Sequence, residues 1–225
     1  MGDVIAFEFL ATAAGVSAAW FSPGLSERPV PPPDEVAHVV EPAYLRASPG
    51  GRVVARIDGR TPFGSARVHP VVRRSGDWLG VIAPESPNGR LGWLPAEHAR
   101  LADRRVRLYV DLSARTMRVT RGARTVRRVR VAVGAPGTPT PTGRFAVTDR
   151  LEGFGAYGCC ILALSARQPN LAQGWSGGDR IAIHGTAATW SIGTAASNGC
   201  LRTTDRDMRR LVRLARPGTR VLIKR

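Results

Sequence analysis

A thiol and an imidazole with glycine beside each of them mark residues 181–202 as the stretch assembled for chemistry. The apolar alternation of residues 181–183 predicts a short strand that ends at His184 and is broken by Gly185. Cys200 follows sixteen positions after His184. A neighbouring imidazole can take the thiol proton and hold the thiolate as an ion pair, which turns a weak nucleophile into a strong one. We therefore predict cysteine-based acyl chemistry.

The residues around the thiol fit roles in such a site. Gly199 places no Cβ beside the sulfur, so a carbonyl substrate can approach, and we expect the N–H groups of Gly199 and Cys200 to face a developing oxyanion. Ser197 is expected to form the turn, and the amide of Asn198 can donate a hydrogen bond. The planar guanidinium of Arg202 can clamp a substrate carboxylate or anchor the loop, and both roles stay open.

These motifs resemble the catalytic signature of the L,D-transpeptidases that carry a YkuD-type domain. The family pattern is His-Gly, a variable loop, Ser/Thr-x-Gly-Cys and often an Arg two residues later, and this chain has 184–185, 197–200 and Arg202 in that order. One position departs from it: the family often has His two residues before the Cys, where this chain has Asn198. The resemblance therefore implies no second imidazole here.

The resemblance extends upstream and covers roughly residues 105–225. Residues 131–134 (VAVG) and 140–145 (TPTGRF) are similar to the family's "VG…TPTGxF" segment. Aromatic residues line the cleft in this family, which makes Tyr157 a candidate for substrate binding, although a Tyr at a strand start is more often packing. Separate motifs in the family's order make the resemblance specific.

The resemblance implies a peptidoglycan enzyme that forms 3→3 cross-links between stem peptides. Cys200 would carry a thioester acyl-enzyme, His184 would act as base, and the Gly185 carbonyl would orient the imidazole. No cofactor is implied, because the thioester conserves the energy of the broken amide. Alternatives are an L,D-carboxypeptidase, an enzyme that attaches proteins to peptidoglycan, and a non-catalytic wall-binding protein.

The composition is strongly basic, with 33 Lys and Arg against 17 Asp and Glu and a net charge of +16. The basic residues are spread along the chain, almost all are arginine, and no helix-turn-helix or zinc-finger pattern accompanies them. We therefore expect no nucleic-acid partner. If the charge has a use, an anionic wall polymer or an acidic membrane surface fits it better. We expect a monomer.

The three cysteines do not have the spacing of a metal site, so no metal is expected. Cys159 and Cys160 are predicted to be reduced residues on alternating faces of one strand, with a vicinal disulfide as the alternative. Cys200 is then the free thiol.

The chain divides by composition into four parts. Residues 1–21 are apolar and predict a signal or membrane-anchor segment, and residues 22–35 are a proline-rich linker. We therefore expect an exported protein of the cell envelope. Residues 36–102 have short apolar runs between turn signals, and "GDWLGV" and "GWL" resemble a bacterial SH3-like barrel. Residues 103–225 would form the catalytic domain.

The predicted fold class is mainly β, with a small SH3-like barrel followed by a β-rich catalytic domain of the YkuD type. One helix is expected near the end of the chain. Thr204 is a suitable N-cap, Met208 and Leu211 begin an apolar stripe at helical spacing, and residues 217–218 (Pro-Gly) end it. The amino-terminal dipole of this helix would modestly favour a thiolate at Cys200.

Overall fold

The computed structural model describes residues 34–171 and 178–225. Every described residue belongs to one compact unit, Pro32–Arg225. The predicted segment 1–21 and almost all of the linker 22–35 lie outside the described residues. At its end the linker differs from the prediction, because Glu35 already belongs to a strand. Within the described part of the chain, no helix is long and apolar enough to cross a membrane.

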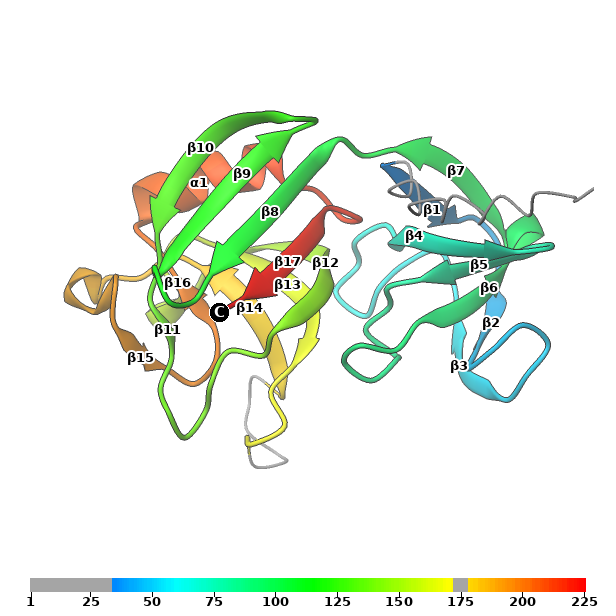
Figure 1. The fold of residues 1–225 in the computed structure, drawn as a ribbon, viewed down its shortest axis with the longest axis horizontal. Helices are drawn as coiled ribbons and strands as arrows, with labels where there is room; N and C mark the ends of the chain where they lie inside the picture. The colour runs from blue at the N-terminus through cyan, green and yellow to red at the C-terminus, as the bar shows by residue number, and fades with distance from the viewer. Residues whose placement is uncertain (1–33, 172–177) are drawn as a thin grey trace, which may run out of the picture. The chain divides into compact units, whose positions relative to one another are not determined.

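The first half of the described chain forms a seven-stranded antiparallel sheet with the order β3-β2-β6-β5-β4-β1-β7 (Figure 1). Its elements are β1 (Glu35–Val39), β2 (Ala43–Arg46), β3 (Val53–Ile57), β4 (Val68–Ser75), β5 (Trp78–Val81), β6 (Gly92–Pro95), η1 (Ala96–His98) and β7 (Ala99–Asp103). The sheet encloses its own core, which includes Leu45, Leu79 and Leu94. Its likeness to an SH3-type barrel stays a prediction.

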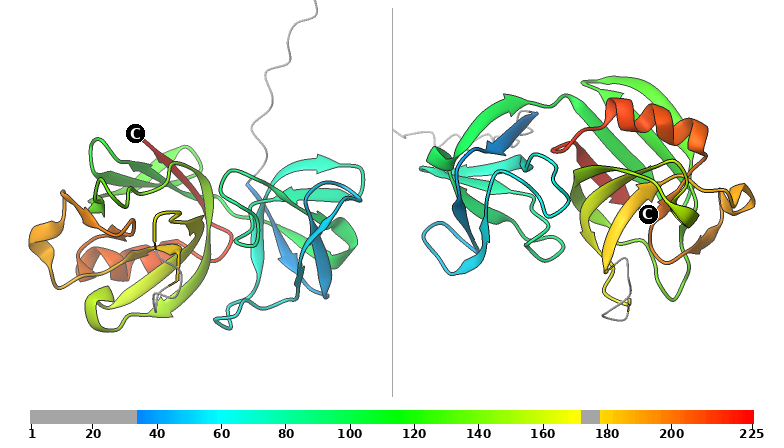
Figure 2. Two further views of the ribbon diagram at one scale, coloured as in Figure 1. Left: turned by 90° about the horizontal axis from the view of Figure 1, so that it is seen from below. Right: turned by 180° about the vertical axis from the view of Figure 1, so that it is seen from behind.

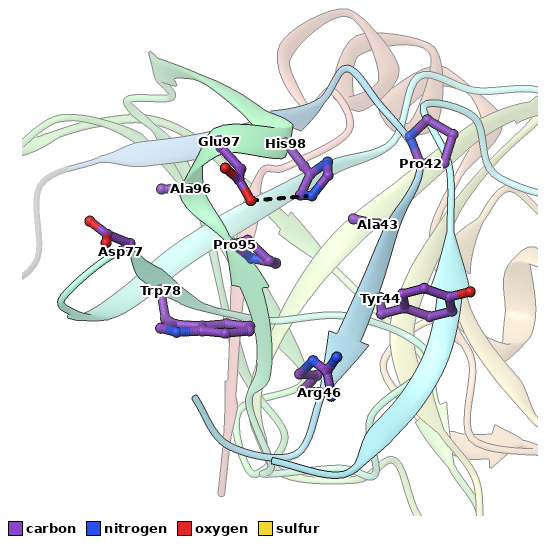
Figure 3. A pocket seen from close by; sticks show the side chains of 10 residues that line it. All are labelled: Pro42, Ala43, Tyr44, Arg46, Asp77, Trp78, Pro95, Ala96, Glu97 and His98. Atoms are coloured by element: carbon purple, nitrogen blue, oxygen red, sulfur yellow. Dashed lines mark ion pairs between the residues drawn. The ribbon is translucent and has the colours of Figure 1, made fainter. Parts of the chain in front are cut away.

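A hollow of about 780 Å³ opens on this first sheet (Figure 3). Tyr44 and Trp78 are its aromatic residues, and His98 forms ion-pair contacts with Glu97 and Glu41 at its edge. The hollow lies on elements outside the stretch that carries the thiol and the imidazole.

The second half of the described chain forms an eight-stranded sheet with the order β10-β9-β8-β17-β12-β13-β14-β16. Its strands are β8 (Val106–Asp111), β9 (Thr116–Arg121), β10 (Arg124–Arg130), β12 (Gly143–Glu152), β13 (Cys160–Arg167), β14 (Arg180–His184), β16 (Leu201–Arg202) and β17 (Arg220–Lys224). A small parallel pair, β11 (Val133–Gly134) with β15 (Ala195–Ser197), stands beside it, and η2 (Gly155–Tyr157) and η3 (Thr189–Ser191) are short 3₁₀ turns. The mainly β fold class is confirmed.

One α-helix, α1 (Asp205–Leu214), is present among the described residues, as predicted. Its N-cap is Thr204, whose Oγ1 accepts the N–H of Asp207 at 3.1 Å. Met208 and Leu211 are fully buried and join the core between the helix and the sheet. Figures 1 and 2 show α1 on one side of β8, β9 and β10. The helix therefore closes one face of this sheet and follows β16 directly.

The cap leads to the first prediction. Thr204→Ala removes the acceptor of an otherwise unpaired helix N–H, so the free energy of unfolding should fall by about 1 kcal/mol. Urea unfolding measures it. Ser113→Ala, at an exposed hydroxyl with no side-chain hydrogen bond among the described residues, is the control and should leave stability unchanged. Equal midpoints for the two variants would contradict the role of the cap.

Candidate active site

His184 ends β14 and Cys200 directly precedes β16, and these two strands pair in parallel. β14 and β16 pair with Ile183 opposite Leu201 and His184 opposite Arg202. Ile183 and Leu201 are both fully buried in the core, so the residues that flank them in each strand point to the other face. Cys200 and His184 therefore share a face, with Cα atoms roughly 8 Å apart by ideal strand geometry. The structure brings together the two residues on which the sequence prediction depends.

The imidazole is held by its own neighbours. His184 is 4% exposed, and its Nδ1–H donates to the Gly185 carbonyl at 2.6 Å, so Nε2 is left as the proton acceptor. The Tyr157 ring stands edge-on to the imidazole at 4.8 Å between centroids. Burial lowers the pKa of His184 to about 4, assisted by the charge of Arg202 and opposed by the Gly185 hydrogen bond. The imidazole is neutral at pH 7.

The thiol is also neutral at rest. Burial raises the pKa of Cys200, although a backbone hydrogen bond at Ala182 and the Arg202 charge both act to lower it. No hydrogen bond joins the sulfur to the His184 ring within the described residues. Burial disfavours the charged form of each group, so the expected thiolate–imidazolium pair gains no support from this arrangement. The imidazole can serve as a base only as the thiol attacks.

A hydrogen-bonded turn fixes the backbone around the sulfur. Ser197, which is 1% exposed, donates from Oγ to the Cys200 carbonyl at 2.6 Å and accepts the Gly199 N–H at 3.1 Å. Gly199 has a φ of +106°, which favours glycine. The predicted turn role of Ser197 fits this geometry. The expected oxyanion role of the Gly199 N–H does not, because that donor is already used, and the Cys200 N–H remains.

Arg202 and Asn198 have different surroundings. Arg202 is half-buried, donates from Nη1 to the Ala196 carbonyl at 3.4 Å, and lies close enough to affect the pKa of the thiol and the imidazole. It therefore anchors the loop and places a positive charge at the site. Asn198 is exposed, and its amide makes no side-chain hydrogen bond within the described residues.

Two residues that support the turn were not identified from the sequence. Thr140 donates from Oγ1 to the Gly199 carbonyl at 2.9 Å and accepts the Gly134 N–H at 2.9 Å. Gln168 donates from Nε2 to the Pro139 carbonyl at 2.5 Å, and a Cβ on Gly199 would lie 2.9 Å from this nitrogen. Thr140 lies in the "TPTG" motif, which was a usable signal, whereas nothing in the sequence singles out Gln168.

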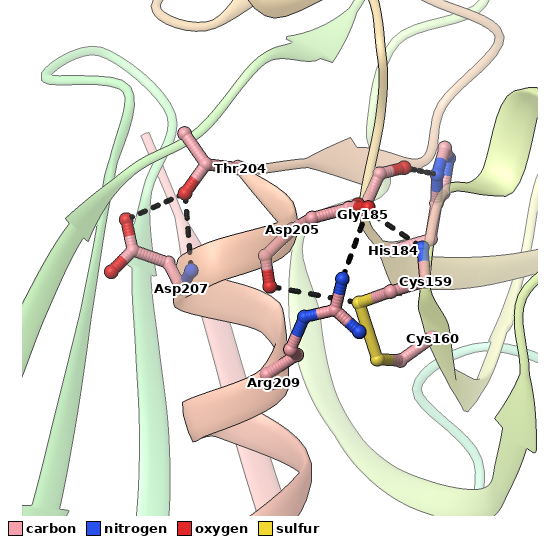
Figure 4. Close-up of a disulfide and its surroundings, with 8 residues drawn as sticks. All are labelled: Cys159, Cys160, His184, Gly185, Thr204, Asp205, Asp207 and Arg209. Carbon is pink, nitrogen blue, oxygen red and sulfur yellow. Dashed lines mark hydrogen bonds and ion pairs between the residues drawn. A yellow bond between two sulfur atoms is a disulfide. The ribbon is translucent and has the colours of Figure 1, made fainter.

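A vicinal disulfide joins Cys159 to Cys160, so the prediction of two reduced side chains is wrong (Figure 4). The physical reason is the backbone: the strand begins only at Cys160, and Cys159 belongs to a turn that starts at Gly158 with φ +63°. The two side chains therefore need not alternate across a strand.

The disulfide is linked by a hydrogen bond to the backbone at Gly185, next to the imidazole. Asp205, the first residue of α1, accepts the Cys159 N–H at 3.0 Å (Figure 4). The Cys160 carbonyl accepts the Gly185 N–H at 3.2 Å. A Cβ on Gly185 would overlap the Asp205 carboxylate, so only glycine fits there. The contacts of this helix end go to Cys159 and Arg209, and none joins it to Cys200 within the described residues, so the predicted dipole effect on the thiol gains no support.

Comparisons with known proteins identify the family of the second half of the chain. Residues 105–223 match the family model of the L,D-transpeptidase catalytic domain, YkuD. Proteins named as candidate L,D-transpeptidase YkuD are 36% identical over 118 residues in Bacillus licheniformis and 33% over 117 residues in Bacillus subtilis. Each alignment covers 52% of this chain and 64% of the relative, so the match spans about two thirds of those proteins.

Solved structures are also similar. An L,D-transpeptidase from Mycobacterium smegmatis aligns with a TM-score of 0.43 and 15% identity, covering 68% of this chain and 80% of the other. An L,D-transpeptidase from Xylanimonas cellulosilytica aligns with a TM-score of 0.39 and 25% identity, covering 53% of this chain and 60% of the other.

The disulfide leads to a prediction about thiol content. Under native, non-reducing conditions the chain should react with one equivalent of a thiol reagent, at Cys200, and after unfolding in reductant with three. Intact-mass spectrometry of the alkylated chain measures both states, and Cys200→Ser should remove the native signal. Three reactive thiols in the unfolded but unreduced chain would show that the bond is absent.

The two neutral groups lead to a prediction about pH. Because burial raises the pKa of Cys200 from 9.0, the rate of its alkylation by iodoacetamide should be low at pH 7 and rise only above pH 9. A cysteine held in an ion pair would instead react at a constant rate through neutral pH. Such a plateau between about pH 6 and 8 would contradict the neutral pair. Cys200→Ser is the control for reaction elsewhere.

Proposed function

The chain belongs to the L,D-transpeptidase family of YkuD-type catalytic domains, and from this premise we propose that it is a cysteine-dependent peptidoglycan transpeptidase that forms 3→3 cross-links between stem peptides. The observation that carries the proposal is the parallel pairing of β14 with β16, which puts Cys200 and His184 on one face of the sheet. A thiol and a neutral imidazole in that arrangement support acyl transfer through a thioester.

Acylation begins with a proton transfer. As the sulfur of Cys200 attacks the donor carbonyl carbon, its proton passes to Nε2 of His184, whose Nδ1–H stays on the Gly185 carbonyl. The tetrahedral oxyanion is met by the Cys200 N–H. When the carbon–nitrogen bond breaks, the imidazole returns the proton to the leaving amine, which by family resemblance is D-alanine, and a thioester remains.

Deacylation reverses the proton transfers. The amine of a second stem attacks the thioester carbonyl and loses a proton to His184 as the new amide forms. The carbon–sulfur bond breaks, and the sulfur recovers a proton from the imidazole. No cofactor takes part. Water in place of the amine would give the carboxypeptidase reaction with the same residues.

The surroundings of the pair suit a peptide substrate. Tyr157, packed on the imidazole, forms a short aromatic row with Phe154 at 5.1 Å between centroids, and Phe154 is 69% exposed. Arg202 brings a positive charge that suits the carboxylates of stem peptides. We further place the enzyme outside the cytoplasm, in the cell envelope and acting as a monomer, because its substrate lies there and residues 1–21 have the composition of an export or anchor segment.

The decisive experiment incubates the protein with disaccharide-tetrapeptide monomers and follows the products by mass spectrometry. The wild type should give 3→3 dimers. Cys200→Ala should give none, because no thioester can form, and His184→Ala should retain at most about a hundredth of the rate, because general-base assistance is lost. A carbapenem should add its mass to the wild type and not to Cys200→Ala.

The product pattern separates the rival functions. Tripeptides without dimers would assign hydrolysis in place of cross-linking, and a lack of any product from the folded wild type would overturn the enzymatic assignment. Asn198→Ala is a matched control on the same loop. Its exposed amide contacts no other described group, so the variant should keep near wild-type turnover and rule out general disruption of the loop.

A further inference from the structure

The net positive charge of the chain comes from its second half. Residues 105–225 contain 22 Lys and Arg against 6 Asp and Glu, whereas residues 1–104 contain 11 of each sign. A general preference for arginine would raise the arginine content of both halves, and arginine is frequent in both. Such a preference would not remove the acidic residues from one half only. The imbalance between basic and acidic residues therefore needs an explanation within the second half of the chain.

Strand register places much of this charge on one face. In β8, Leu108 and Val110 are buried in the core that α1 also joins, so Arg107, Tyr109 and Asp111 point the other way. The pairing of β9, β10, β12 and β17 with β8 carries this alternation across the sheet. Within the outward set we name six basic residues the cationic face: Arg107, Arg118, Arg128, Arg130, Arg144 and Lys224.

Little within the protein neutralises the cationic face. Arg107 is paired with Asp34 at 2.5 Å, and Asp111 stands opposite Lys224 in the register. Arg128, Arg130, Arg144 and Lys224 are exposed and have no acidic partner within 4.0 Å among the described residues. α1 lies on the opposite side of β8, β9 and β10, so no helix of the described chain covers this face there (Figures 1 and 2).

One pair of like charges on the cationic face destabilises the folded sheet. Arg118 and Arg128 are directly opposite in the β9–β10 ladder. Like charges in such a position destabilise a sheet, because their Cβ atoms are only about 5 Å apart. Arg118 gains some compensation, since its guanidinium lies 4.5 Å over the Tyr109 ring. Arg128 gains none of this kind, so an external anion between the two guanidinium groups would relieve their repulsion.

We propose that the cationic face binds a linear polyanion of non-aromatic phosphodiester units. Arginine forks match phosphate oxygens in pairs, and Arg128 and Arg130 repeat along β10 at about 6.8 Å, a spacing that a flexible chain of phosphates can follow. Nucleic acid fits less well, because base stacking needs open aromatic rings. Tyr109 is the one aromatic residue on these outward strand positions, and Arg118 already covers it.

A membrane surface also fits less well. Peripheral membrane binding combines basic residues with apolar side chains that enter the lipid. Leu222 is the large aliphatic residue in the outward row between Tyr109 and Arg144, and it is half-buried. The cationic face is thus suited to charge contacts along a chain more than to insertion.

The test measures binding of fluorescent poly(glycerol phosphate) by anisotropy at about 50 and about 200 mM salt. The wild type should bind, with an affinity that falls steeply with salt. Arg118→Gln/Arg128→Gln should bind about tenfold more weakly or worse and lower the salt slope by roughly 1 to 2 units, because two phosphate contacts are lost. The matched control Arg56→Gln/Arg90→Gln removes the same charge from exposed positions of the first half of the described chain and should bind as the wild type does.

Measurements of stability and turnover on the same variants distinguish a loss of binding from a loss of fold or activity. Thermal unfolding of Arg118→Gln/Arg128→Gln should give a Tm equal to or above that of the wild type, because a like-charge pair is removed. Turnover on soluble tetrapeptides should not change, so failure of this proposal is distinct from failure of the proposed function. Equal binding by both double variants would overturn the proposal. So would tighter binding to single-stranded DNA of equal charge, or to phosphatidylglycerol vesicles in preference to the polymer.

Discussion

The parallel pairing of β14 with β16 is the contact on which the site depends. Its register, Ile183 opposite Leu201, buries two aliphatic side chains on one face and so sends Cys200 and His184 to the other. A slip of one residue would reverse this and place the sulfur in the core. Parallel strands cannot be joined by a tight hairpin, so residues 185–200 must form a crossover. Hydrogen bonds hold that crossover along its length and at both of its ends.

At each end the support comes from elements distant in sequence. Gly185 is fixed by the Cys160 carbonyl and by Asp205, while Gly199 is fixed by Thr140 and Ser197. Both positions need glycine, one because a carboxylate fills the space of a Cβ and the other because its φ is positive. The same enclosure desolvates the thiol and the imidazole, which disfavours the charged form of each.

Much of this arrangement was predictable, because the signals are local. The alternation before His184, the cap at Thr204 and the spacing of Met208 and Leu211 each depend on neighbouring residues, and the strand and helix formed as they indicate. The predictions that were wrong concern residues whose roles depend on tertiary contacts. The Gly199 N–H is taken by Ser197 Oγ, and the turn at Gly158 lets two adjacent cysteines meet. Gln168 reaches the turn from a distant strand end, and no residue pattern near it reports that contact.

The distribution of charge is likewise not predictable from the sequence alone. The whole-chain value of +16 suggests a diffuse excess of arginine, because a sum over the sequence cannot tell a balanced half from an unbalanced one. Register resolves it: alternate residues of β8, β9 and β10 divide between the core and an outward row, and Arg118 meets Arg128 across that row. Selection for stability alone would remove such a pair, since a single neutral side chain would relieve it. His184, by contrast, is buried and Cys200 is half-buried, and they lie at β14 and β16. The thiol–imidazole site and the cationic face therefore lie at different strands of one sheet and depend on different residues.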